Sequence, residues 1–154
     1  MRVLVINGPN LNLLGVRRPE VYGTTTLAEL DESCRAWGAA LGIEVETFQS
    51  NHEGEIIDRL HDALGSADGV VLNPGALTHY SYSLHDAVEA VALPVVEVHL
   101  SDISQREEWR AHSVVSPACA ASIRGHGVEG YREALEFLAA RAVASSRGEG
   151  ELEP

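Results

Sequence analysis

The chain has 154 residues, of which 45% are hydrophobic, and this fits one globular domain with a sizeable core rather than two domains. Its net charge of −12 at pH 7 argues against nucleic acid or an anionic membrane as the main partner, because attraction to phosphates needs a basic surface. The chain contains no lysine, and its 11 Lys and Arg positions are all arginine, so Schiff-base and phosphate-loop lysine chemistry are excluded.

The first predicted element is a strand over Arg2–Ile6, and a long polar loop follows it. This loop, Asn7 to Gly23, reads NGPNLNLLGVRRPEVYG and contains asparagines, arginines and a tyrosine. Arg17 lies five residues before Tyr22, and a cation close to a phenol stabilises the phenolate, which is a strong base. The alternative is a surface turn with solvated arginines, and the spacing alone does not decide between the two.

Strand and helix patterns then alternate along the chain. Runs rich in Val and Ile have strand length, and apolar residues at helical spacing separate these runs. Thr26 and Glu29 form a capping box that opens a helix ending at Gly42. The remaining strands are expected at Glu44–Gln49, Gly69–Leu72, Pro94–Leu100 and Ala120–Arg124, and the remaining helices at Glu55–Leu64, Leu84–Val91 and Tyr131–Val143, with a short turn near Glu107–His112.

This alternation predicts the fold class. Strands linked by crossover helices imply a parallel sheet that is covered on both faces. We therefore expect an α/β protein of the flavodoxin-like, doubly wound class, with a five-stranded parallel sheet and helices on both faces. Residues 1–144 would form a single domain, and the acidic segment 145–154 is expected to be a disordered tail.

Polar residues collect where the predicted strands end. In open parallel sheets, ligands bind beyond the carboxyl ends of the strands. At these ends the chain has QSNHEG at 49–54, NPGALTH at 73–79 and HLS at 99–101. Each segment alone is explained by ordinary turn and cap chemistry, since Asn, Gly, Ser and Pro are turn residues. Together the segments indicate a polar pocket.

Two titratable residues stand out in the fourth predicted strand. Glu97 and His99 are two residues apart, so both side chains leave the same face of the strand. A buried carboxylate beside an imidazole can fix its tautomer and keep it protonated, as a general acid requires. The alternative is a pair with a purely structural role. Arg106 and Arg110, near Trp109, could hold an anion or merely cover a helix face.

Other kinds of site have little support in the sequence. The seven histidines show neither an HExxH pattern nor a compact His/Cys cluster, so no metal site is expected. No GxGxxG or GxxxxGK loop follows the first strand, which leaves mononucleotide binding with only the fold to support it. Cys34 and Cys119 are expected to be reduced thiols. No signal peptide or membrane span is apparent, which favours a cytoplasmic protein with no membrane partner.

Five motifs, in order along nearly the whole chain, resemble those of type II 3-dehydroquinate dehydratases. They are INGPNLNLLG with Arg17 and Tyr22, QSNHEG, NPGALTH, EVHLS at 97–101 and REEWRAHS at 106–113. The resemblance implies a flavodoxin-like enzyme that reversibly removes water from 3-dehydroquinate through an enolate, without metal or cofactor. It leaves open whether the enzyme serves aromatic biosynthesis or quinate breakdown.

The resemblance also implies roles for individual residues. Tyr22 would be the base, held as tyrosinate by Arg17, and Asn10 would position a water against the enolate oxygen. His99 would protonate the departing hydroxyl, with Glu97 as its orienting partner. The substrate-binding residues implied by the same motifs are Asn73, Gly75, His79, Arg110, Leu100 and Ser101, with Asp86 supplied by a neighbouring subunit.

The resemblance also bears on how the chain assembles. The resemblance implies a homo-oligomer, with trimers assembled into a dodecamer. The chain departs from common family residues at Arg18, Tyr80, Tyr82, His85 and Asp102, none of them at a proposed catalytic position. The competing hypotheses are a non-catalytic module that binds a nucleotide or a protein, and an interaction scaffold that has lost activity.

Overall fold

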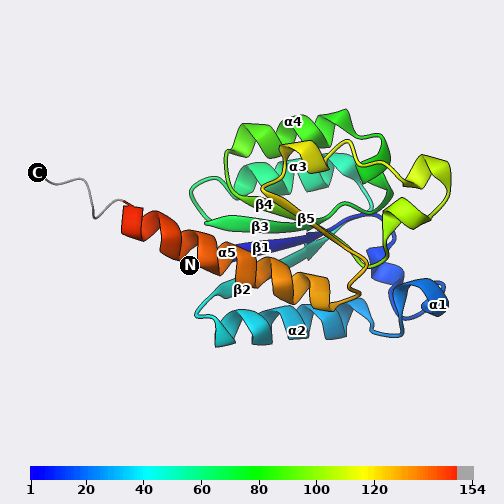
Figure 1. Ribbon diagram of the computed structural model, residues 1–154, viewed down its shortest axis with the longest axis horizontal. Coiled ribbons are helices and arrows are strands. Elements are labelled where there is room, and N and C mark those ends of the chain that lie inside the picture. The colour runs from blue at the N-terminus through cyan, green and yellow to red at the C-terminus, as the bar shows by residue number, and fades with distance from the viewer. Residues whose placement is uncertain (149–154) are drawn as a thin grey trace, which may run out of the picture.

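The computed structural model describes residues 1–148, which are built around one five-stranded parallel sheet (Figure 1). The strand order is β2-β1-β3-β4-β5, so the chain winds outward from β1 in both directions. The predicted doubly wound α/β fold is therefore confirmed. The elements are β1 (Arg2–Asn7), α1 (Pro19–Tyr22), α2 (Leu27–Ala40), β2 (Glu44–Gln49), α3 (Glu53–Asp62), β3 (Gly69–Asn73), α4 (Tyr82–Val91), β4 (Val95–His99), β5 (Ala121–Arg124) and α5 (Glu129–Gly148).

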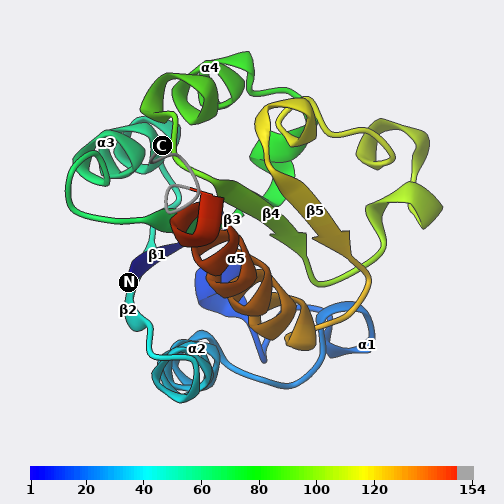
Figure 2. The ribbon, with the colours of Figure 1, turned by 60° about the vertical axis from the view of Figure 1, so that its left-hand side comes forward.

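Helices cover both faces of the sheet. Helices α2 and α5 lie on one face, and α3 and α4 lie on the other (Figures 1 and 2). Alternate residues of β1 point to the two faces: Val3 and Val5 pack with α2 and α5, whereas Leu4 and Ile6 pack with α3 and α4. All four side chains are buried. A strand that is buried on both faces reads as a continuous apolar run, as this one does.

The helix boundaries follow from capping chemistry. The capping box predicted at α2 is present, because the Glu29 N–H donates to Thr26 Oγ1 at 3.2 Å and the Thr26 N–H donates to Glu29 Oε2 at 2.8 Å. Helix α4 begins before the predicted Leu84 because the Ser81 hydroxyl accepts a hydrogen bond from the Leu84 N–H at 3.0 Å. A side-chain oxygen at the helix start satisfies an N–H that has no partner within the helix.

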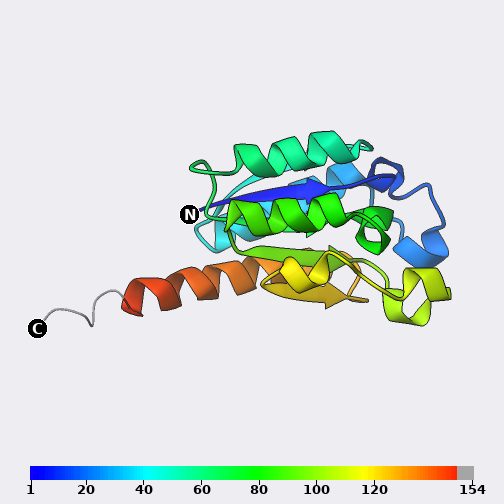
Figure 3. The same cartoon turned by 90° about the horizontal axis from the view of Figure 1, so that it is seen from above.

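Helix α5 is longer at its C-terminal end than the sequence analysis predicted. It continues to Gly148, so residues 145–148, which were assigned to a disordered tail, are helical instead. The run from 134 to 146 is rich in Ala and contains neither Gly nor Pro, which favours continuation of the helix. Figure 3 shows the end of α5 extending beyond the sheet. The rest of the expected tail, 149–154, lies outside the described residues.

Within the described part of the chain, no helix has both the length and the apolar character needed to cross a bilayer.

The loop after β1, predicted as irregular, contains a 3-10 turn at Leu11–Leu13 and the short helix α1. Helix α1 begins with Pro19 at its first position. Proline has no backbone N–H, and this costs nothing here because an N–H at the first position has no acceptor within the helix.

Two glycines allow the loops after β1 and β3 to approach each other. A Cβ on Gly8 would lie 2.6 Å from the Pro74 carbonyl oxygen, closer than real Cβ contacts. Gly75 has φ +57°, and a Cβ there would lie 2.9 Å from the Pro9 carbonyl oxygen. The residues following these two adjacent strands are therefore held together at one edge of the sheet, at the switch point of the topology.

Candidate active site

A cavity of about 230 Å³ lies at the carboxyl ends of β1, β3 and β4. It is the position that the doubly wound fold favours for a ligand. The structure gathers around this cavity most of the residues singled out from the sequence, although they lie far apart in the chain. Those lining it are Asn10, Arg17, Tyr22, Asn73, Gly75, His79, His99, Leu100, Ser101 and Arg110.

The cavity is locally cationic in a strongly acidic protein. Arg17, Arg106 and Arg110 line it, and no Asp or Glu is among its described lining residues. Three guanidinium groups around a partly enclosed space attract an anion and orient a carboxylate well, because their donors match its two oxygens. The net charge of −12 therefore does not describe the charge that a ligand meets here.

Tyr22 lies between two arginines. The guanidinium carbon of Arg17 is 5.4 Å from the centre of the Tyr22 ring, so the predicted proximity of this pair is confirmed. The hydrogen bond to the phenol, however, comes from Arg106, whose Nη1 donates to Tyr22 Oη at 2.8 Å. The sequence predicts Arg17 as the cation acting on Tyr22 and gives no sign of Arg106, which lies 84 residues away along the chain. This charge-assisted hydrogen bond fixes the position of the phenol oxygen at the cavity.

Asn10 is held at the mouth of the cavity by its backbone. It has φ 69°, a left-handed conformation that Asn tolerates better than most residues. The Asn10 N–H donates to Asn51 Oδ1 at 2.9 Å, and the Gln49 side-chain amide donates to the same oxygen at 3.1 Å. These contacts come from the segment 49–54 that the sequence placed near the pocket. The Asn10 side-chain amide is left to face the cavity that it lines.

His99 and Glu97 form the same-face contact that the sequence predicted. His99 Nε2 lies 2.8 Å from Glu97 Oε1. Since a carboxylate only accepts, Nε2 carries a proton, and the other ring nitrogen, Nδ1, is left for the cavity that His99 lines. The Glu97 side chain is fully buried beneath the cavity rather than exposed in it. The contact fixes both the tautomer and the orientation of the imidazole.

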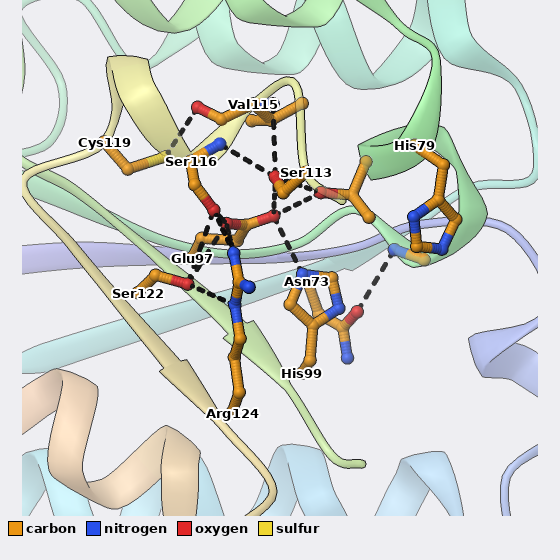
Figure 4. A network of polar contacts seen from close by, with 12 residues as sticks. Asn73, His79, Glu97, His99, Ser113, Val115, Ser116, Cys119, Ser122 and Arg124 are labelled. Atoms are coloured by element: carbon orange, nitrogen blue, oxygen red, sulfur yellow. Dashed lines mark hydrogen bonds and ion pairs between the residues drawn. The ribbon is translucent and has the colours of Figure 1, made fainter. Parts of the chain in front are cut away.

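Glu97 accepts hydrogen bonds from several elements (Figure 4). Its Oε1 accepts from His99 and from the hydroxyls of Thr78 and Ser113, and its Oε2 accepts from Ser116 and Ser122. Burial by itself would raise the pKa of Glu97, but the hydrogen bonds and charge of His99 and the Ser116 and Thr78 hydroxyls outweigh it and lower the pKa to about 2. The carboxylate is therefore ionised at neutral pH.

This lowered pKa predicts loss of stability in acid. The folded pKa of Glu97 is about 2 against an ordinary value of 4.5, so its contribution is complete above pH 4.5 and is lost as the pH falls towards 2. The difference corresponds to about 3 kcal/mol. Denaturant unfolding at constant protein concentration should show Glu97→Gln losing less free energy of unfolding between pH 6 and pH 3 than the unmodified protein loses.

Glu32→Gln is the matched control, because Glu32 is exposed. This variant should retain the acid sensitivity of the unmodified protein. If Glu97→Gln lost as much stability as the unmodified protein between pH 6 and pH 3, another buried group would be responsible for the acid sensitivity.

Asn73 is oriented by a buried chain of polar groups that sequence analysis did not find. Asn73 Nδ2 donates to Tyr131 Oη at 2.8 Å, and Tyr131 Oη donates to Asn7 Oδ1 at 2.6 Å. Asn73 Oδ1 accepts from the Gly75 N–H at 3.1 Å. Burial raises the pKa of Tyr131 above its usual range, so the phenol stays neutral and can donate. Tyr131 was predicted only as a helix residue, and no local pattern links it to β1 and β3.

His79 presents one nitrogen to the cavity. Its Nδ1 lies 2.7 Å from the His112 carbonyl oxygen and must donate to it, which leaves Nε2 free to meet a ligand. Its ring meets Trp109 edge to face, with centroids 5.4 Å apart. Burial lowers the pKa of His79, and the charges of His99, Arg110 and Arg106 act in the same direction. A neutral imidazole whose free Nε2 accepts a hydrogen bond from a ligand hydroxyl fits these contacts.

Three predicted substrate-binding residues remain, of which two line the cavity and one does not. Leu100 and Ser101 follow β4 directly and line the cavity. Asp86 does not: it is exposed on α4, outside the cavity of its own chain. No group of three or more His, Cys, Asp or Glu side chains within residues 1–148 is arranged to hold a metal ion.

The fold is a parallel, doubly wound α/β sheet, and its cationic cavity contains a tyrosine between two arginines and a histidine bound to a carboxylate. This arrangement fits an α/β protein that carries out acid–base chemistry on an anion. Comparison with known proteins makes the assignment specific. The chain matches the family described as "Dehydroquinase class II" over residues 1–139, and it belongs to that family.

Curated relatives and solved structures agree with this assignment. "3-dehydroquinate dehydratase" of Bacillus pumilus is 51% identical over 143 residues, covering 93% of this chain and 97% of the relative. "Catabolic 3-dehydroquinase 2" of Neosartorya fischeri is 48% identical over 145 residues, covering 94% and 96% of the two chains. The crystal structure of type II dehydroquinase from Propionibacterium acnes superposes with a TM-score of 0.88 at 42% identity, covering 90% of this chain and 96% of that one.

Proposed function

We propose that the protein is a 3-dehydroquinate dehydratase, which removes water from 3-dehydroquinate to give 3-dehydroshikimate through an enolate. The observation that carries the proposal is one cavity, in a chain of this family, lined by Tyr22 with its arginine donor and by His99 with its carboxylate partner. A base and an acid in one anion-binding cavity are what elimination beside a ketone requires.

Tyr22 is the base in this proposal. Its phenolate oxygen removes the proton from the carbon beside the ketone, and the electron pair moves into the carbonyl to form an enolate. The hydrogen bond from Arg106 and the nearby charge of Arg17 stabilise the phenolate before the reaction. Asn10 positions a water that donates to the enolate oxygen, where negative charge develops.

His99 is the acid. When the enolate collapses, the carbon–oxygen bond to the leaving hydroxyl breaks, and Nδ1 of His99 supplies the proton that makes the leaving group water. Glu97 stabilises the imidazolium before transfer and keeps Nδ1 directed into the cavity. After product release, a proton passes from Tyr22 to His99 through solvent, which restores both groups.

The arginines and backbone groups would hold the substrate. Its carboxylate is expected to lie at Leu100 and Ser101, where backbone N–H groups and the serine hydroxyl can donate. Asn73, His79 and Arg110 would bind ring hydroxyls. The buried chain through Tyr131 supports this role for Asn73, since it leaves one amide hydrogen and one oxygen lone pair for a ligand.

The assay is ultraviolet absorbance of purified protein, treated with chelator and mixed with 3-dehydroquinate. Growth of the absorbance of the conjugated enone is expected, because every proton transfer in this scheme uses a protein side chain and none uses a metal or cofactor. A flat trace from folded protein would contradict the proposal and favour a binding module or scaffold.

We also propose that the enzyme acts as a homo-oligomer of trimers assembled into a dodecamer, with Asp86 completing the site of a neighbouring subunit. The exposed position of Asp86, outside the cavity of its own chain, supports this role. Size-exclusion chromatography with light scattering should give a three-fold multiple of the chain mass of 16.5 kDa.

Asp86→Ala should lower kcat/KM roughly ten-fold, whereas Asp58→Ala, at an exposed position of α3, should not. A fully active monomer would contradict the shared site. Aromatic biosynthesis and quinate breakdown both use this dehydration, and relatives named with and without the word catabolic have similar identity to this chain. A cytoplasmic location is proposed from the two free cysteines, and cell fractionation tests it.

A further inference from the structure

A second cation lies against the carboxylate that orients His99. Arg124 is the last residue of β5, and it pairs with His99 in the register of the neighbouring strands, as Ser122 pairs with Glu97. Side chains that are paired in this way leave the same face of the sheet. Figure 4 shows Arg124 and His99 both extending towards Glu97 from these two strands.

The two basic groups meet different oxygens of the carboxylate. His99 Nε2 lies 2.8 Å from Oε1, whereas Arg124 Nη2 lies 3.8 Å from Oε2. The Arg124 guanidinium is also fixed by hydroxyls: Nη2 donates to Ser116 Oγ at 2.6 Å, and Nε donates to Ser122 Oγ at 3.0 Å. Both of these hydroxyls donate in turn to Glu97 Oε2. Arg124 is therefore part of a built network and not a solvated surface arginine.

From this geometry we propose that Arg124 is a positioning residue that acts through Glu97 to limit how tightly His99 holds its proton. A carboxylate that faces the imidazole alone stabilises the imidazolium strongly, which makes a weak acid. A fixed guanidinium on the opposite oxygen offsets part of that negative charge, so the imidazolium releases its proton more readily. The inference rests on the proposed dehydratase function, in which His99 is the acid.

Other charged and titratable groups lie near the Glu97–His99 pair, and the effect of Arg124 has to be distinguished from theirs. His99 shares its cavity with Tyr22, His79, Arg17, Arg106 and Arg110. Arg124 faces Asp102 as well as Glu97, and Cys119 lies near Glu97 with its pKa raised to about 12, chiefly by burial. Arg124 does not line the cavity, so changing it removes no contact with the substrate. Its influence on the reaction is therefore electrostatic and acts on the Glu97–His99 pair rather than on the substrate.

The test is the pH profile of kcat for 3-dehydroquinate dehydration. An acid must be protonated to act, so kcat falls on the alkaline side as His99 loses its proton. Arg124→Met removes the charge at similar length and should move this alkaline limb to higher pH by about one unit. Its plateau kcat should fall roughly three-fold, since a weaker acid transfers its proton more slowly. KM should change little. Arg124→Lys should keep the limb of the unmodified enzyme.

Two further variants separate electrostatics from packing. Arg124→Gln keeps hydrogen-bonding groups for Ser116 and Ser122 without the charge, so it should give the same shift even if Arg124→Met folds poorly. Arg132→Met removes a half-exposed arginine of α5 that pairs with Glu129 and lies outside this network, so its alkaline limb should match that of the unmodified enzyme. A loss of activity with an unmoved limb in both charge-removing variants would mean that Arg124 is merely structural and would overturn the inference. An unmodified enzyme without dehydratase activity would overturn the proposed function itself.

Discussion

Tyr22→Phe is expected to lower kcat by roughly 10³-fold, the scale of losing a positioned general base, while the fold is retained. Only the phenolic oxygen is lost, and with it the hydrogen bond of 2.8 Å from Arg106. The ring keeps its place between two guanidinium groups, whose carbons lie 5.4 and 5.5 Å from its centre. Steady-state kinetics of 3-dehydroquinate dehydration should therefore show a loss in kcat with little change in KM.

Tyr82→Phe is the matched control, because Tyr82 is 71% exposed on α4 and its ring does not line the cavity. It removes the same hydroxyl and should keep normal turnover. Circular dichroism and light scattering should show that both variants keep the fold and assembly. A Tyr22→Phe enzyme that retained most of its kcat would eliminate Tyr22 as the base.

His99→Ala is expected to lower kcat by roughly 10²- to 10³-fold, because the leaving hydroxyl then departs without a proton donor. The variant also leaves the buried Glu97 carboxylate without its partner at 2.8 Å, which should lower stability. His99→Gln is therefore the better test of chemistry alone, since its amide can donate to Glu97 but cannot act as an acid. Both variants should lose kcat, and His99→Gln should be the more stable of the two.

His61→Ala removes an exposed histidine of α3 and should leave kcat unchanged. Thermal unfolding of all three variants measures their stability under the same conditions. If His99→Gln turned over at the normal rate, the imidazole would have a structural role, which is the alternative that the two-residue spacing left open.

The fold could be predicted from the sequence because its signals are local. The capping box of Thr26 and Glu29 indicates the start of α2, and apolar runs of strand length indicate the buried strands. The same local logic placed Glu97 and His99 on one face of β4. Residues 145–148 were misassigned because their charged and small residues resemble a terminal tail, whereas their helical state follows from the Ala-rich run that precedes them.

The candidate site was predicted less completely because several of its contacts join distant segments. Arg106 was noticed only as a possible anion ligand, and nothing in its neighbourhood indicates that it meets Tyr22. The Asn7–Tyr131–Asn73 chain likewise joins β1, α5 and β3. The rule that ligands bind beyond the carboxyl ends of parallel strands could have placed Arg106 near the cavity, but only packing decides which group it contacts.

The proposed mechanism requires Tyr22 and His99 to act at separate stages, with an enolate between them. Proton NMR of 3-dehydroquinate in D₂O tests it directly, with an enzyme-free sample as the baseline. With His99→Gln, the proton beside the ketone should exchange for deuterium although little product forms, because the base works and the acid does not. Tyr22→Phe should give neither exchange nor product. Exchange with Tyr22→Phe as fast as with His99→Gln would contradict this mechanism.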